Sequence, residues 1–172
     1  MSLADIINSI IAAATIAAAV FAFVQIRHAI RERSAAKQAE IDGVAVQWFP
    51  KVRPHTASAD GSAVWQYEIA VRNPGSLPIR DVTVDLRFAV PIRRQHFDEN
   101  VDPETRTLQL VQPVILGLGV RDWRRTIRMP YDQHSALEQT TADVTFTTLA
   151  GERRTNHMDG RPPTIHEPDP RR

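Results

Sequence analysis

The segment "VWQYEIAVRNPGSLPIRDVTVDLRF", residues 64–88, decides the fold, because it holds two alternating runs of apolar and polar residues joined by a turn. Alternation with a period of two predicts β-strands that are buried on one face. Pro74, Gly75 and Pro78 supply the turn chemistry between the two runs. The inward positions that this pattern predicts are Trp65, Tyr67, Ile69, Val71, Val82, Val84, Leu86 and Phe88.

Weaker runs of the same kind extend the pattern on both sides, at 43–49, 107–111, 121–129 and 143–149. In the last run Val144 and Phe146 fall on one face. Short strands separated by Pro, Gly and Asp turns predict a mainly β fold, an antiparallel two-sheet sandwich over residues 42–154. No helical period long enough for a βαβ crossover interrupts them, so a parallel α/β fold is disfavoured.

Three segments within roughly residues 64–155 also resemble a known family pattern. "VRNPGSLPIRDVTVDLRF" looks like part of bacterial immunoglobulin-like or fibronectin-like sandwiches, and "ILGLGV" before "RRTIRMP" is similar to their next turn. "VTFTTLAGERR" resembles a final hairpin of membrane-anchored actinobacterial proteins of unassigned function. The chain departs from that hairpin at Thr148, where Asp is expected, and at Arg154, near the place of a Trp. The resemblance implies a fold and transfers no active site.

The N-terminal region contains a run without charge from Ile6 to Ile26, bracketed by Asp5 and Arg27. As a helix these 21 residues would be roughly 31 Å long, close to the ~30 Å thickness of a bilayer's hydrocarbon core. A cleaved signal is disfavoured, because such signals carry basic residues before the apolar core and Asp5 is the only early charge. We expect a transmembrane helix, with a helix buried in a protein assembly as the alternative.

Basic residues follow the uncharged run, and by the positive-inside rule they place that end on the cytoplasmic side. The expected location is the inner cell membrane, with the N-terminus outside, the C-terminal domain in the cytoplasm, and an extracytoplasmic domain as the alternative. The helix should continue as a stalk, since neither Gly nor Pro occurs until Gly43, which makes residues 1–41 the first part of the chain. The expected membrane-interface residues are Arg27, Arg31, Arg33 and Lys37.

Small residues at four-residue spacing could bring two such helices together as a homo-oligomer, at Ala13 with Ala17 and Ala14 with Ala18. At the other end of the chain, residues 155–172 are rich in proline and have little to bury. We expect this segment to be a disordered tail.

Composition limits the function. From Ile41 onward there are 17 basic and 17 acidic residues, so the domain lacks the basic excess expected of a nucleic-acid binder. The chain has no cysteine, which excludes disulfides and thiolate chemistry. No hydrolase, phosphate-loop or zinc-protease motif is present, and none for a cofactor, so we expect a protein that is not an enzyme.

Two groups of residues are candidates for binding. The alternating oxygens of "DENVDPE" resemble a calcium loop, but Pro103 and Gln109 stand where an EF-hand needs Gly and Glu. A looser cation site and a solvated acidic turn both remain open for this loop, whose candidate ligands are Asp98, Asn100, Asp102 and Glu104. The arginine doublets at 93–94, 124–125 and 153–154 could hold a phosphate or an acidic partner. Along 121–129, alternation also places Arg121 beside Trp123, which invites guanidinium stacking.

The sequence therefore predicts a single-pass membrane protein whose β-domain binds a protein partner as an adaptor or regulatory module. The alternative is a membrane-tethered sensor of a ligand or ion, with the acidic loop or the arginines as its site.

Overall fold

The computed structural model describes residues 3–167, except for the side chains of residues 3–14, 16 and 17. The chain divides into two compact units, Met1–Ala39 and Glu40–Arg172. Each unit is described by itself.

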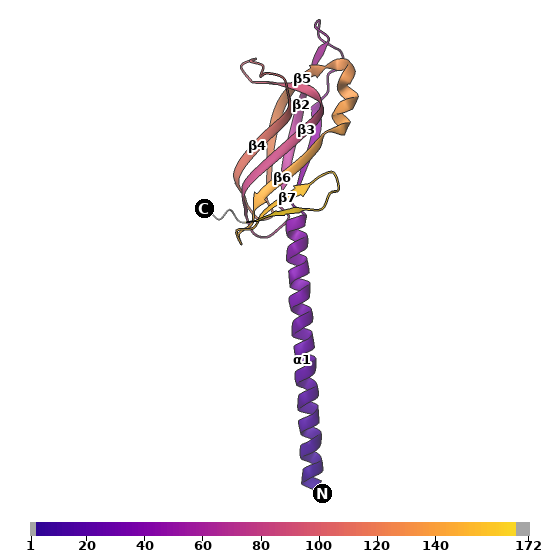
Figure 1. Ribbon diagram of the computed structural model, residues 1–172, viewed down its shortest axis with the longest axis vertical. Coiled ribbons are helices and arrows are strands. Elements are labelled where there is room, and N and C mark those ends of the chain that lie inside the picture. Colours follow the sequence, from indigo (N-terminus) through magenta and orange to yellow (C-terminus); the bar gives the residue numbers. More distant parts are fainter. Residues whose placement is uncertain (1–2, 168–172) are drawn as a thin grey trace. The chain divides into compact units, whose positions relative to one another are not determined.

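Helix α1 begins at Leu3 and ends at Asp42 (Figure 1). The first unit contains this helix as far as Ala39, and the last residues of the helix belong to the second unit. The unbroken course of α1 confirms that the helix continues past Ile26 to the residues just before Gly43. Within the part of the chain that is described, no helix has a stretch both long and apolar enough to cross a bilayer. Much of the expected span, at 6–14, 16 and 17, has its side chains outside the described residues.

The second unit is built from antiparallel strands, with a short 3₁₀ segment before the sixth strand. The strands form one connected sheet in the order β1-β2-β5-β3-β6-β7-β8. Strand β4 lies outside this order and also pairs with β3. The bounds are β1 Ala45–Val52, β2 Ser62–Arg72, β3 Ile79–Gln95, β4 Thr105–Ile115, β5 Val120–Pro130, η1 Tyr131–Gln139, β6 Thr141–Thr147, β7 Arg153–His157 and β8 Thr164–His166. The prediction of a mainly antiparallel β domain preceded by one helix is confirmed. The sheet curves into a half-barrel, and the immunoglobulin-like sandwich is not confirmed.

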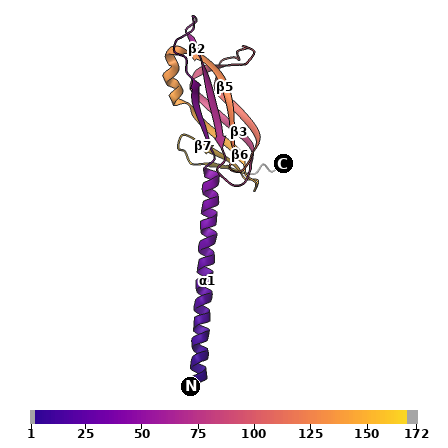
Figure 2. The same cartoon turned by 180° about the vertical axis from the view of Figure 1, so that it is seen from behind.

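Strand β3 explains why the sheet stays connected. Its first part pairs with β4 and β6, whereas its last residues, 93–95, pair with β5. Figures 1 and 2 show β3 running between β6 and β5. The pairing with β4 shifts register between Arg87 and Ile92, a stretch that includes Pro91, which has no N–H to donate. The strand therefore bends there and passes between two parts of the sheet, which we call its arms. One arm holds β4, β6, β7 and β8, and the other holds β1, β2 and β5.

The core lies inside this curve. All eight inward positions predicted from residues 64–88 are buried, and so are Val144 and Phe146. Trp123 and Ile127 of β5 join the same cluster. The alternating pattern therefore predicted the buried face of three strands correctly.

The predicted disordered tail is wrong for residues 155–157 and 164–166, which belong to β7 and β8. Hydrogen bonds between side chains join the two strands: Thr155 Oγ1 lies 2.8 Å from His166 Nε2, and His157 Nε2 lies 3.0 Å from Thr164 Oγ1. His157 Nδ1 also lies 2.8 Å from Oδ1 of the buried Asp143 on β6. Polar pairing of this kind orders a segment that has few apolar residues. Residues 168–172 of the tail lie outside the described residues.

Two buried polar residues of β7 hold the chain where it enters β1. The amide of Asn156 donates to the carbonyls of Val44 (2.9 Å) and Ile41 (3.1 Å). The guanidinium of Arg154 donates to Asp42 at 3.0 Å and also pairs with Glu152. Because buried polar groups are costly without partners, these contacts fix residues 41–44 against β7.

Candidate functional site

Three exposed leucines lie on two adjoining loops of the second unit, and we call Leu77, Leu116 and Leu118 the leucine tip. Their exposed fractions are 51%, 71% and 77%. Leu77 lies in the β2–β3 loop, and the other two lie in the β4–β5 loop. The nearby Val114 and Val120 are also exposed, so the apolar surface extends along the β4–β5 hairpin.

The buried side chain of Asn73 joins these two loops. Its Nδ2 donates to the carbonyl of Leu77 at 2.9 Å and to the carbonyl of Leu116 at 3.0 Å. Its Oδ1 accepts the N–H of Gly75 at 3.1 Å, and its own N–H donates to Gly119 at 2.9 Å. One side chain therefore forms hydrogen bonds with backbone groups of both loops and holds the leucine tip in place.

The β4–β5 loop has a conformation that few sequences could adopt. Leu118 has a φ of 56°, and its N–H donates to the carbonyl of Gly75 at 2.8 Å. A Cβ at Gly117 would lie 2.1 Å from the carbonyl oxygen of Ser76, so only glycine fits there. A leucine held in the left-handed region costs energy unless its surroundings enforce it, and such residues gather at functional positions.

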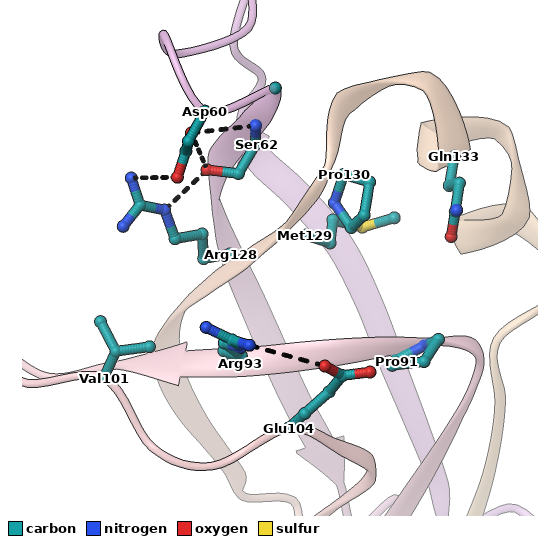
Figure 3. A pocket seen from close by; sticks show the side chains of 11 residues that line it. Asp60, Ser62, Pro91, Arg93, Val101, Glu104, Arg128, Met129, Pro130 and Gln133 are labelled. Carbon is teal, nitrogen blue, oxygen red and sulfur yellow. Dashed lines mark hydrogen bonds and ion pairs between the residues drawn. The ribbon is translucent and has the colours of Figure 1, made fainter.

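A cavity of about 380 Å³ lies where β3, β5 and the loop before β2 meet (Figure 3). Two arginines line it, Arg93 and Arg128, which are cross-strand partners. Arg128 donates from Nε to Ser62 Oγ at 2.8 Å and pairs with Asp60 at 3.5 Å, while Arg93 pairs with Glu104 at 3.7 Å. Each cation thus has its own carboxylate, and the cavity carries no excess charge.

The carboxyl group of Asp60 belongs to the lining of this cavity. Hydrogen bonds from the hydroxyl and the N–H of Ser62 hold the pKa of Asp60 below its usual range, and the charge of Arg128 contributes less. The group is fully ionised near neutral pH, which favours its pairing with Arg128.

The structure does not bring the acidic-loop candidates together as cation ligands. Asp98 accepts hydrogen bonds from the backbone and side chain of Asn100, and Asp102 Oδ1 lies 2.8 Å from His96 Nε2. Glu104 turns toward Arg93. Among the residues whose side chains are described, no group of three acidic or histidine residues could hold a metal ion.

The arginine doublets do not converge on one face, because neighbouring residues of a strand point in opposite directions. Arg93 and Arg124 pair with the carboxylates of Glu104 and Glu68. Arg94 and Arg125 lie on the other side of the sheet, with Arg121, whose guanidinium lies 5.6 Å from the Trp123 ring centre. The predicted stacking of Arg121 on Trp123 is confirmed.

The predicted membrane-interface residues Arg27, Arg31, Arg33 and Lys37 are all exposed on α1. The guanidinium of Arg27 lies 5.7 Å from the centre of the Phe23 ring. Exposure alone does not test whether these residues contact a membrane surface, so that role stays a prediction.

An aromatic cleft of about 410 Å³ lies beside η1, and its walls include Trp48, Trp65, Tyr67 and His134. Tyr131 stacks on Trp65, with ring centres 6.3 Å apart, and on His134, with ring centres 5.5 Å apart. Burial raises the pKa of Tyr67 to about 12, although the charge of Arg53 acts in the opposite direction.

Sequence reasoning missed the leucine tip and the role of Asn73. The motif "NPGSLP" indicated a turn but not the contact of that turn with "ILGLGV", which lies about 40 residues later. The available signal was the pair of glycines around Leu118, which marks a loop under close backbone contact.

No protein-family model matches the sequence, and no curated protein matches it either. Among solved structures, a Bordetella pertussis protein that carries the name ApaA is 12% identical, with a TM-score of 0.43, over 75% of this chain and 95% of that chain. A FixG-related protein from Vibrio parahaemolyticus is 11% identical, with a TM-score of 0.30, over 73% of this chain and 97% of that chain. The sporulation control protein Spo0M of Bacillus subtilis is 13% identical, with a TM-score of 0.32, over 74% of this chain and 51% of that chain. All three TM-scores are below 0.5, so these similarities carry no functional conclusion.

Replacing Asn73 by Ala should lower the free energy of unfolding by about 2–3 kcal/mol, because it leaves carbonyl groups of both loops without their donor. Amide exchange at Leu118 should also become faster, since its N–H is protected by the contact between the loops. Denaturant unfolding and hydrogen exchange measure the two effects. The control is Asn100→Ala in an exposed turn, which should change stability by less than about 0.5 kcal/mol. Unchanged amide exchange at Leu118 in the Asn73→Ala variant would contradict the role of Asn73 in holding the two loops together.

The raised pKa of Tyr67 predicts a loss of stability in alkali. Between the ordinary pKa of ~10 and the folded-state value of about 12, the native protein binds more protons than the unfolded chain. The free energy of unfolding should therefore fall as the pH rises from 10 to 12, whereas Tyr67→Phe should fall less steeply. Unfolding titrations at pH 8, 10 and 11 test this, and equal slopes for both proteins would show that Tyr67 is not responsible.

Proposed function

We propose that this chain is a binding module without enzymatic activity, that α1 tethers it to the inner cell membrane, and that the leucine tip contacts a protein partner. The observation that carries the proposal is the rigid display of Leu116 and Leu118 in a loop fixed by Asn73. A surface that is apolar and already ordered loses little conformational entropy on binding, which is how a few residues come to dominate an interface.

A protein partner fits this tip better than a lipid surface does. The leucine tip and the nearby Val114 and Val120 include no tryptophan, tyrosine or lysine, the residues typical of membrane interfaces. The carboxylate of Glu40 lies beside it, accepting the N–H of Ser76 at 3.3 Å, and a negative charge there opposes contact with anionic lipid. An apolar pocket on another protein requires no interfacial aromatic or lysine residues and need not carry a negative charge that would repel Glu40.

The proposal of a membrane tether rests on the uncharged run from Ile6 to Ile26 and on apolar side chains farther along α1. Five large apolar side chains are exposed in the described part of the run that ends at Ile26: Val20, Phe21, Phe23, Val24 and Ile26. Successive residues of a helix are turned by ~100°, so these five point in many directions instead of forming one stripe. Apolar residues on all sides favour lipid over a single packing partner, and the basic residues that follow favour a cytoplasmic domain.

We also propose that the two arms of the curved sheet correspond to the layers of an immunoglobulin-like sandwich. The support is that buried residues of β2 and β5 share one core with those of β3, β4 and β6. The alternative function, a tethered sensor of a ligand, is favoured by one separate observation, the arginines on the inner face of β5.

The leucine tip can be tested by photo-crosslinking in cells that produce the full chain. A crosslinking amino acid at Leu116 should capture a discrete protein, and Asn73→Ala should reduce that capture at least fivefold by loosening the loop. Leu149 is the matched control, because it is an exposed leucine in the separate β6–β7 loop. Equal capture from Leu116 and Leu149, or crosslinks from Leu116 to lipid alone, would contradict a protein contact at the tip.

The tether is tested by fractionation after lysis without detergent. The full chain should sediment with membranes, and replacing Ala18 and Phe21 by Arg should release it, since each charge costs about 2.5–3.5 kcal/mol at the centre of a span. The same two charges at Ala35 and Ala36 in the stalk should leave it bound. Since the chain has no cysteine, labelling of a single Ser135→Cys variant in intact cells then reports on which side the domain lies. Recovery of the unmodified chain in the aqueous fraction would refute the tether.

A further inference from the structure

Three arginines lie on the inner face of the sheet, Arg121 and Arg125 on β5 and Arg94 near the end of β3. Arg125 is the cross-strand partner of Tyr67, which is buried on that face. Arg94 is the partner of Ile127, which is fully buried on the same face. Arg121 lies four residues before Arg125 and therefore on the same side of β5. A face otherwise filled by apolar side chains thus carries three guanidinium groups.

These three charges differ from the neighbouring arginines in having no counter-ion. Arg93, Arg124 and Arg128, which point to the other side of the sheet, each form an ion pair with a carboxylate. Within the described part of the chain, no carboxylate lies within 4.0 Å of the inner three. The outer face is therefore balanced in charge, and the inner one is not.

Arg125 combines partial burial, nearby like charges and a nitrogen without a hydrogen-bond partner. Burial lowers the pKa of its guanidinium, and the nearby charges of Arg94 and Arg121 lower it further. Its Nη1 donates to the carbonyl of Arg124 at 2.8 Å, but its Nε is buried without a hydrogen-bond partner. A buried donor that lacks a partner and sits among like charges is costly, and an anion would relieve both costs.

The remaining geometry suits an anion with several oxygens. The Trp123 ring supports the guanidinium of Arg121, which limits the positions that this side chain can take. Guanidinium groups are planar donors that bind phosphate oxygens in pairs. A phosphate group with about two negative charges could accept from all three arginines, whereas a single carboxylate has one charge and two oxygens.

We propose that Arg94, Arg121 and Arg125 form a binding site for a phosphate group, supplied either as the free ion or as a phosphomonoester headgroup. The site shares no residue with the leucine tip or with the tether. It would make the domain responsive to a phosphorylated ligand.

The test uses the full chain in neutral detergent micelles, titrated with inorganic phosphate against potassium chloride of equal ionic strength. Phosphate should raise the melting temperature in a saturable way, and calorimetry should give one site for each chain. Arg125→Gln and Arg121→Gln should each weaken binding about tenfold or more. Arg125→Lys, which keeps the charge but loses the paired donors, should bind with intermediate affinity.

The arginine doublets supply matched controls, because Arg93→Gln and Arg124→Gln remove the same charge from the opposite face. Both should bind phosphate within about twofold of the unmodified chain. Without phosphate, Arg125→Gln should melt at the same temperature as the parent or higher, since it removes an uncompensated charge. If Arg125→Gln does not fold, the exposed Arg121 still reports on the site.

A second arm distinguishes the source of the phosphate group. Short-chain phosphatidic acid, a phosphomonoester, is compared in the same micelles with short-chain phosphatidylglycerol, an anionic phosphodiester. Preference for phosphatidic acid that depends on Arg125, with weak binding of free phosphate, would identify a lipid headgroup, and the converse would identify the free ion. No saturable binding of either, or equal losses in the Arg124 and Arg125 variants, would overturn the proposal.

Discussion

Strand β3 is hydrogen-bonded to both arms of the sheet. This double pairing determines where the core and the cavity of the second unit lie. The first part of β3, between β4 and β6, contributes Val82, Val84 and Leu86 to the core. Its last three residues pair with β5 after the shift in register that includes Pro91. Without that bend β5 would have no contact with β3, the cavity in Figure 3 would be lost, and Arg94 would not lie on the same face as Arg125.

The junction of β3 and β5 also shows how strand alternation separates two kinds of surface. Arg93 and Arg94 are neighbours in sequence, yet one faces a cavity with its own carboxylates and the other faces the core side. Arg124 and Arg125 repeat this division on β5. Equal numbers of acidic and basic residues from Ile41 onward therefore conceal a face on which cations are unbalanced.

Much of the fold could be predicted from the sequence, because alternation in residues 64–88 reports directly which side chains are buried. The same local signal could not reveal that β3 continues to Gln95 and changes partners, since pairing depends on contacts between distant segments. Order in β7 and β8 was also missed, because it comes from pairs such as His157 with Asp143 and not from apolar residues. For the sites, spacing predicted the stacking of Arg121 on Trp123, but the leucine tip required two loops to meet around Asn73.

The contacts between β7 and residues 41–44 have a mechanical consequence. A pull transmitted along α1 reaches the domain at Asp42, which is joined covalently to β1 and through Arg154 and Asn156 to β7. The load is then shared between two strands that lie on different arms of the sheet. Separating residues 41–44 from the domain therefore requires the loss of their contacts with β7 as well as the opening of β1.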